Sequence, residues 1–102
     1  QLSISESIIP KKISLYQNFP NPFNPATNIK FQINKPADII LTVYNLKGEV
    51  IRNLISKNEK AGFNVISWNG EDDYGAKVSS GTYIYTITTP EFSDSKKMIL
   101  LK

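Results

Sequence analysis

Residues 62–87 read GFNVISWNGEDDYGAKVSSGTYIYTI, in which two β-rich segments flank a polar loop. The first segment, FNVISW, is followed by the dipeptide Asn-Gly, which is typical of turns. The second segment places Tyr83, Tyr85 and Ile87 on one face and mainly threonines on the other. This period-two alternation predicts short strands that each bury one face.

Further strand signals lie on both sides of this stretch. Residues 29–33 alternate apolar with polar side chains, residues 38–45 are dense in β-branched and aromatic residues, and residues 96–102 read KKMILLK. A turn is expected from Pro90 through Ser93. With a short segment from Ser14, the chain has about seven strands, and the sequence predicts an all-β fold, an Ig-like or fibronectin-like antiparallel β-sandwich.

Residues 49–61 are ambiguous in this scheme. The apolar residues of this stretch fall at helical spacing but also fit an irregular strand: Val50, Ile51, Leu54 and Ile55. Taken alone, the periodicity slightly favours a helix. The preceding Lys47-Gly48 supplies a turn.

A proline-rich segment, YQNFPNPFNPAT, occupies residues 16–27. Proline fixes φ and pushes the preceding residue toward an extended conformation, so the segment is neither a helix nor a central strand. We expect rigid turns that lay Phe19 and Phe23 across one end of the sandwich. The side chains of Asn21 and Asn24 are expected to bond nearby backbone groups.

Two features also permit ligand-binding interpretations. Pro22 and Pro25 satisfy the PxxP pattern of polyproline ligands, but the segment carries no flanking basic specificity residue and adjoins a strand. Trp68, with Tyr83 and Tyr85, could stack on a sugar ring if exposed. A lone Trp more often packs in a core, and a Tyr near the start of a late strand more often ties strands together through its hydroxyl.

The composition excludes most catalytic designs. The chain has 102 residues, sufficient for one domain with a core, and contains neither His nor Cys. Ser/His/Asp triads, cysteine nucleophiles, disulfides and the usual zinc and haem sites are therefore impossible, and we expect neither enzymatic activity nor a cofactor. The net charge of +3 arises from scattered residues, which argues against nucleic-acid binding. No apolar run approaches the roughly 20 residues of a transmembrane segment.

The only acidic cluster is Glu71-Asp72-Asp73, whose oxygen ligands suit calcium. Its spacing does not match an EF-hand loop, and consecutive carboxylates in a turn point in different directions. Asp72 and Asp73 are thus the only candidate metal ligands, with turn capping as the simpler interpretation. A glycosidase needs two carboxyl groups facing each other across a cleft, which adjacent loop residues do not provide.

The first residues differ from the rest of the chain. Residues 1–13 lack a sustained period and contain Pro10, so they are predicted to form a linker or an entering edge strand, with the sandwich in residues 14–102. The chain begins at Gln1 without Met or an apolar leader. We expect that any export signal is absent or was removed from a longer precursor, and that the chain is a piece of a larger protein.

Three motifs occur in order, namely the proline-rich segment, VYNLKGEVIRNL at residues 43–54, and residues 62–87, followed by KKMILLK. Together they resemble the type A C-terminal sorting domain of the type IX (Por) secretion system and, more distantly, the Ig-like domain of flagellar hook-capping proteins. The resemblance covers about nine tenths of the chain. It implies a strand after Gly48, which we adopt in place of the helix.

The resemblance implies a non-catalytic export address. Such a domain follows a cargo domain in the same precursor and carries it across the outer membrane to the cell surface or the medium. Its partners are outer-membrane translocon and shuttle proteins and a sortase-like protease, which would cut before Ser14. The alternative is an uncleaved structural or adhesive module, with carbohydrate binding as a lesser alternative.

The resemblance also assigns roles to residues. The last strand and the terminal basic residue form part of the address, read by backbone pairing and alternate side chains: Lys96, Lys97, Met98, Ile99, Leu100, Leu101 and Lys102. From the residues alone, this strand could turn either Met98 and Leu100 or Ile99 and Leu101 to the core. The family signature is expected to be structural: Asn18, Pro20, Asn21, Pro22, Phe23, Asn24, Pro25, Gly48, Gly62, Trp68, Gly70, Gly75, Gly81 and Tyr83.

Overall fold

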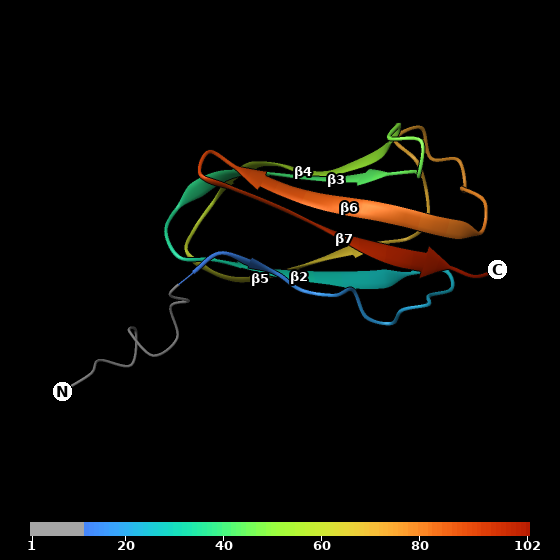
Figure 1. Cartoon of the computed structure of the whole chain (residues 1–102), viewed down its shortest axis with the longest axis horizontal. Helices are drawn as coiled ribbons and strands as arrows, with labels where there is room; N and C mark the ends of the chain where they lie inside the picture. Colours follow the sequence, from blue (N-terminus) through green and yellow to red (C-terminus); the bar gives the residue numbers. More distant parts are fainter. Residues whose placement is uncertain (1–11) are drawn as a thin grey trace.

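The computed structural model describes residues 12–102, which form two facing antiparallel sheets (Figure 1). The predictions for residues 1–11 lie outside this part. The seven strands are β1 (Ser14–Leu15), β2 (Thr27–Ile33), β3 (Ala37–Tyr44), β4 (Val50–Glu59), β5 (Gly62–Trp68), β6 (Gly81–Thr89) and β7 (Phe92–Leu100). One sheet has the order β1-β2-β5 and the other β4-β3-β6-β7. The predicted all-β, Ig-like sandwich is confirmed.

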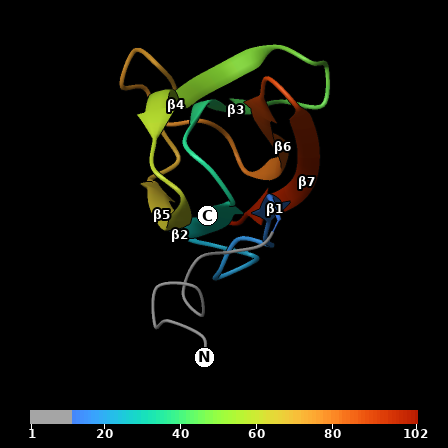
Figure 2. The ribbon, with the colours of Figure 1, turned by 90° about the vertical axis from the view of Figure 1, so that its left-hand side faces the viewer.

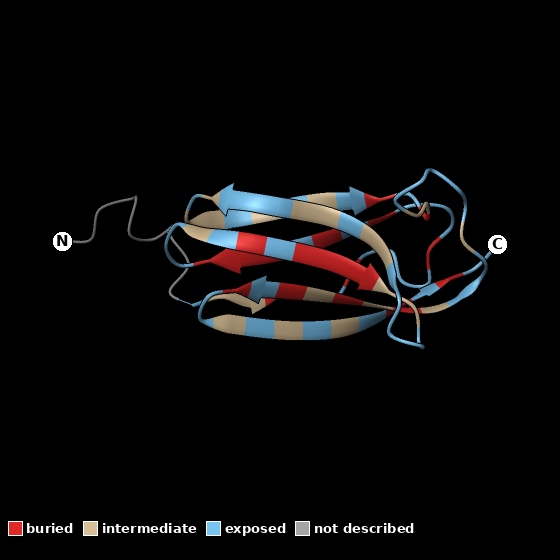
Figure 3. Ribbon diagram, turned by 90° about the horizontal axis from the view of Figure 1, so that it is seen from above, coloured by how far each residue is buried: buried red, intermediate tan, exposed pale blue. Residues whose placement is uncertain are grey.

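Buried residues alternate with more exposed ones along the strands (Figure 3), and the buried side chains of both sheets form one core. The predicted inner face of β6 is confirmed, because Tyr85 and Ile87 are fully buried and Tyr83 is nearly so. The inner residues of β2 and β3 are equally inaccessible: Ile29, Phe31, Ile33, Ile39, Leu41 and Val43. Burying this apolar surface is the main force that holds the two sheets together.

Residues 50–59 form a strand, as the family resemblance implies, and the helical interpretation is wrong. The register between β3 and β4 shifts twice, which leaves Leu54 and Ile51 as extra residues of β4 without a direct partner. Both pack against the core. The two bulges interrupt the period of two and bring apolar residues to spacings of three and four, which imitates a helix.

The last strand is longer than the sequence indicated. The predicted turn at Pro90–Ser93 is confined to Pro90 and Glu91, because Phe92 already pairs with Thr89. The strand ends at Leu100, so the final two residues lie beyond it. In the described residues, no helix is long and apolar enough to cross a membrane.

The two sides of the sandwich differ (Figure 2). On one side, β4 and β5 are the edges of their sheets, and a groove of about 470 Å³ between them exposes apolar side chains such as Leu54 and Ile66. On the other side, β1 contacts β7, and the proline-rich segment continues along β7. This second side contains the proline-rich half of the family signature.

Trp68 is the largest fully buried side chain and tests the packing of the core. Truncating it to Ala should lower the free energy of unfolding by about 3–5 kcal/mol, because ring contacts are lost and a cavity remains. The control is Tyr74→Ala, at a side chain that is 95% exposed, where the change should stay within about 0.5 kcal/mol. Urea unfolding followed by circular dichroism measures both; equal costs would contradict the packing described here.

Candidate functional site

The carboxylates of the acidic loop form hydrogen bonds that stabilise the loop and attach it to a strand. The Asp72 carboxylate accepts the backbone N–H groups of Tyr74 and Ala76 at 2.9 and 3.0 Å, which caps the turn. The Asp73 carboxylate accepts the backbone and side-chain N–H groups of Asn53 at 2.9 and 3.1 Å, which docks the loop on β4. Among residues 12–102, no three His, Cys, Asp or Glu side chains gather as metal ligands would.

The aromatic residues that could have bound a sugar lie inside the protein. Trp68 is 1% exposed, with its ring centroid 5.7 Å from Phe23 and 5.6 Å from Tyr83. Its indole N–H donates to the carbonyl oxygen of Glu71 at 2.8 Å. The hydroxyl of Tyr83 donates to the carbonyl of Ser79 at 2.6 Å, in the loop just before its own strand, so it anchors that loop and does not tie two strands together as expected. Sugar stacking on these rings is therefore excluded, and Trp68 has the packing role.

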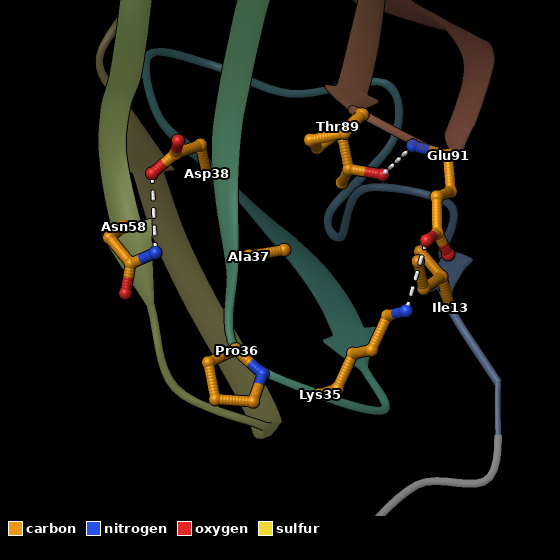
Figure 4. A pocket seen from close by; sticks show the side chains of 9 residues that line it. Ile13, Lys35, Pro36, Ala37, Asp38, Asn58, Thr89 and Glu91 are labelled. Atoms are coloured by element: carbon orange, nitrogen blue, oxygen red, sulfur yellow. Dashed lines mark hydrogen bonds and ion pairs between the residues drawn. The ribbon is translucent and has the colours of Figure 1, made fainter.

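A hollow lies at the end of the sandwich opposite the C-terminus (Figure 4). It measures about 380 Å³, and the sequence had not indicated it. Its charged groups are already paired, since Lys35 contacts Glu91 at 3.0 Å and Asn58 donates to Asp38 at 3.2 Å. Each polar side chain that lines the hollow already has a hydrogen-bond or ion-pair partner within the protein, so the hollow is not the candidate site.

The proline-rich segment is fixed by a buried polar network. Asn18 is 2% exposed, and its side-chain amide donates to the Pro20 carbonyl at 3.1 Å and to the Thr27 hydroxyl at 2.9 Å. Its backbone N–H donates to the hydroxyl of Tyr85 at 2.8 Å, and that hydroxyl donates to the carbonyl of Tyr16 at 2.7 Å. The core of one sheet therefore holds the start of this segment in place.

The expectations for the phenylalanines and asparagines of this segment are half right. Phe23 is buried against Trp68, but Phe19 is 78% exposed because its backbone pairs with Asn28 and turns the ring to solvent. Asn21 bonds a backbone group, the N–H of Ile99. The Asn24 side chain makes no hydrogen bond among the described residues, contrary to the expectation.

Signature glycines stand at turns and strand ends. Gly70 has φ +77°, and a Cβ atom there would lie 3.3 Å from the carbonyl oxygen of Pro25. Glycine is thus required both by the backbone conformation and by the close approach of the proline-rich segment. The others also have positive φ and lie in loops or at the first residue of a strand: Gly48, Gly62, Gly75 and Gly81.

The proline-rich segment lies along the outer edge of β7, the strand that contains most of the predicted address. The backbone N–H of Phe23 donates to the carbonyl of Ile99 at 2.9 Å, and the N–H of Leu101 donates to the carbonyl of Phe23 at 3.0 Å. The side chain of Asn21 accepts the N–H of Ile99 at 3.0 Å, and Gln17 donates to the carbonyl of Lys97 at 2.7 Å. Phe23 and Leu100 form a parallel bridge. The sequence had not indicated this pairing or the part played by Gln17.

The side chains of the predicted address separate by face. Met98 and Leu100 are buried in the core, which decides between the two registers left open by the sequence. Ile99 is 40% exposed, and Lys97 lies on the same outward face. Lys96 is half-buried at the rim, whereas Leu101 and Lys102 are exposed beyond the strand.

The family model of the FlgD Ig-like domain matches residues 20–91, about seven tenths of the chain. The chain belongs to the FlgD Ig-like domain family. The match begins inside the proline-rich segment and ends just before β7, so the whole predicted address lies outside the matched residues of this FlgD Ig-like domain. No curated protein matches the sequence.

Two solved structures from Porphyromonas gingivalis have a similar fold. Dimeric latent PorU matches with a TM-score of 0.66 and 21% identity over 87% of this FlgD Ig-like domain and 9% of PorU. PorZ, an essential bacterial surface component of the type-IX secretion system, matches with a TM-score of 0.59 and 16% identity over 87% of the chain and 12% of PorZ. The chain thus spans about a tenth of the length of these proteins.

The Tyr85 hydroxyl provides a direct test of how the proline-rich segment is held. The Tyr85→Phe variant keeps the ring but leaves the buried N–H of Asn18 without its partner. The free energy of unfolding should therefore fall by about 1–3 kcal/mol. Tyr44→Phe is the matched control, because that hydroxyl has no hydrogen bond among the described residues. Chemical denaturation measures both variants; a Tyr85→Phe protein as stable as the control would contradict this network.

Alkaline pH should act through the same group. Burial raises the pKa of Tyr85 to about 12, an effect that the Asn18 hydrogen bond opposes and the nearby Asp94 charge reinforces. The stability contributed by neutral Tyr85 is complete below its ordinary pKa of about 10 and is lost as the pH rises toward 12, because only the unfolded chain then releases the proton.

The difference in unfolding free energy between wild type and Tyr85→Phe should therefore shrink from pH 9 to pH 11.5. Groups common to both proteins cancel in that difference. A constant gap across this range would show that the folded and unfolded pKa values of Tyr85 are equal.

Proposed function

We propose that this chain is a type A C-terminal sorting domain of the type IX secretion system. It directs a cargo domain in the same precursor across the outer membrane and is then removed. The observation that carries the proposal is the joining of its two signature elements, since the proline-rich segment is hydrogen-bonded to the edge of the last strand. Membership of the FlgD Ig-like domain family and the fold shared with PorZ support it.

The proposed role is one of recognition and not of catalysis. The partners are the outer-membrane translocon, its shuttle proteins and a sortase-like protease that cuts upstream of Ser14. The exported product reaches the cell surface or the medium through the periplasm. The sandwich supplies a rigid support for the address, because Met98 and Leu100 anchor the last strand in the core while alternate side chains remain outside.

An uncleaved structural module is the second candidate function. Its supporting observation is the match to the FlgD Ig-like domain, which covers strands β2 to β6 but not the last strand. The two candidates differ in the mass of the mature protein at the cell surface. A sorting domain is missing from that protein, whereas a structural module remains attached to it.

The test of the proposed function is a reporter followed by the complete 102-residue chain, expressed in a bacterium with a type IX system. The reporter should reach the surface or the medium, and deleting Lys97–Lys102 should abolish this export because the address is lost. The deletion also removes Met98 and Leu100 from the core.

The control is therefore Ile33→Ala, which weakens the core by about 2–5 kcal/mol but retains the last strand. It should still be exported. Equal export of the truncated and complete chains would contradict a terminal address.

A further inference from the structure

The edge of β7 near its end is already paired within the molecule. In an antiparallel sheet, every second residue of an edge strand points its N–H and C=O groups away from its neighbour. On β7 these residues include Lys97 and Ile99, and the chain continues in the same way at Leu101. Four of their outward groups are taken: the side chain of Gln17 bonds the C=O of Lys97, the side chain of Asn21 bonds the N–H of Ile99, and the backbone of Phe23 bonds the C=O of Ile99 and the N–H of Leu101.

An incoming strand could therefore pair with this part of β7 only by displacing four hydrogen bonds. It would also have to move Phe23, which is 2% exposed and packs on Trp68. The remaining edge, at Ser93 and Ser95, lies outside the predicted address, and the N–H of Ser95 is bonded to the Asp94 carboxylate at 2.9 Å. The expected backbone reading of the last strand thus conflicts with the folded structure.

The outward face of the same strand is unobstructed. Ile99 is 40% exposed and Leu101 53% exposed. A shallow hollow of about 220 Å³ lies farther back along the same strand, lined by Ile84, Ser95, Lys96 and Lys97. No ion pair among residues 12–102 involves Lys96, Lys97 or Lys102. The face thus combines two apolar side chains with Lys97 and the terminal Lys102, which form no ion pair within the part of the chain that the structure describes.

We propose that the export machinery reads the outward face of the last strand, through the side chains of Lys97, Ile99 and the terminal Leu101-Lys102, and not its backbone edge. The inference rests on the proposed sorting function. The partner of matching chemistry is a protein surface with an apolar recess for Ile99 and Leu101, bordered by carboxylates that pair with the lysines. In this proposal the proline-rich segment occupies the backbone edge of β7 and so fixes the position of the outward face.

The experiment uses the same reporter followed by the complete chain. The face variant Lys97→Glu/Ile99→Thr changes only outward side chains and should lower the exported fraction about tenfold or more, as loss of a binding hot spot does. Its matched control is Lys30→Glu/Val65→Thr, because these residues are neighbours on the outward face of the other sheet. The control should be exported as wild type is.

A third variant, Asn21→Ala, uncovers the N–H of Ile99 and should leave export within about twofold of wild type. Thermal unfolding of each purified chain shows that the variants are folded. Export that increases in Asn21→Ala while the face variant behaves as wild type would establish edge pairing and overturn the inference.

The inference and the proposed function fail in different ways. If the deletion of Lys97–Lys102 blocks export but the face variant matches its control, the address exists and its reading through the outward face is wrong. If the complete chain does not export the reporter at all, both are wrong. A face variant that is folded, retained in the cell and distinct from its control supports the inference.

Discussion

The hydroxyl of Tyr85 lies 2.8 Å from the backbone nitrogen of Asn18 and 2.7 Å from the carbonyl oxygen of Tyr16. Tyr85 belongs to β6, in the four-stranded sheet, whereas Tyr16 follows β1 of the other sheet. This one buried group fixes the point where the chain leaves the three-stranded sheet and begins to follow β7. A phenylalanine would fill the same space but would not satisfy the two backbone groups that must be buried there.

The rest of that side of the sandwich follows from this point. Once Asn18 is fixed, its amide orders Pro20 and Thr27, and the prolines direct Phe23 onto Trp68. Phe23 then presents its backbone to Ile99 and Leu101. Every buried side-chain polar atom in the described residues has a hydrogen-bond partner. The polar network is therefore buried beside the apolar core without an unpaired group.

The sequence predicts what depends on alternation and little of what depends on contact between distant segments. The inward faces of β2, β3 and β6 could be predicted because each is a regular strand that buries every second residue. Residues 50–59 could not, since two bulges break the period. The exposure of Phe19 depends on its pairing with Asn28, and the covered edge of β7 depends on Asn21, and no local pattern encodes either contact.

The hydrogen bond between Gln17 and Lys97 joins residues 80 positions apart. Polypeptides emerge from the ribosome beginning at the N-terminus. The proline-rich segment is therefore synthesised early but can form this hydrogen bond only after β7 has been synthesised. Until then the backbone of Phe23 lacks its hydrogen-bond partners, Ile99 and Leu101. This side of the sandwich can therefore form only after β7 has been synthesised. A chain that ends before β7 would have neither the complete fold nor the outward face of the last strand.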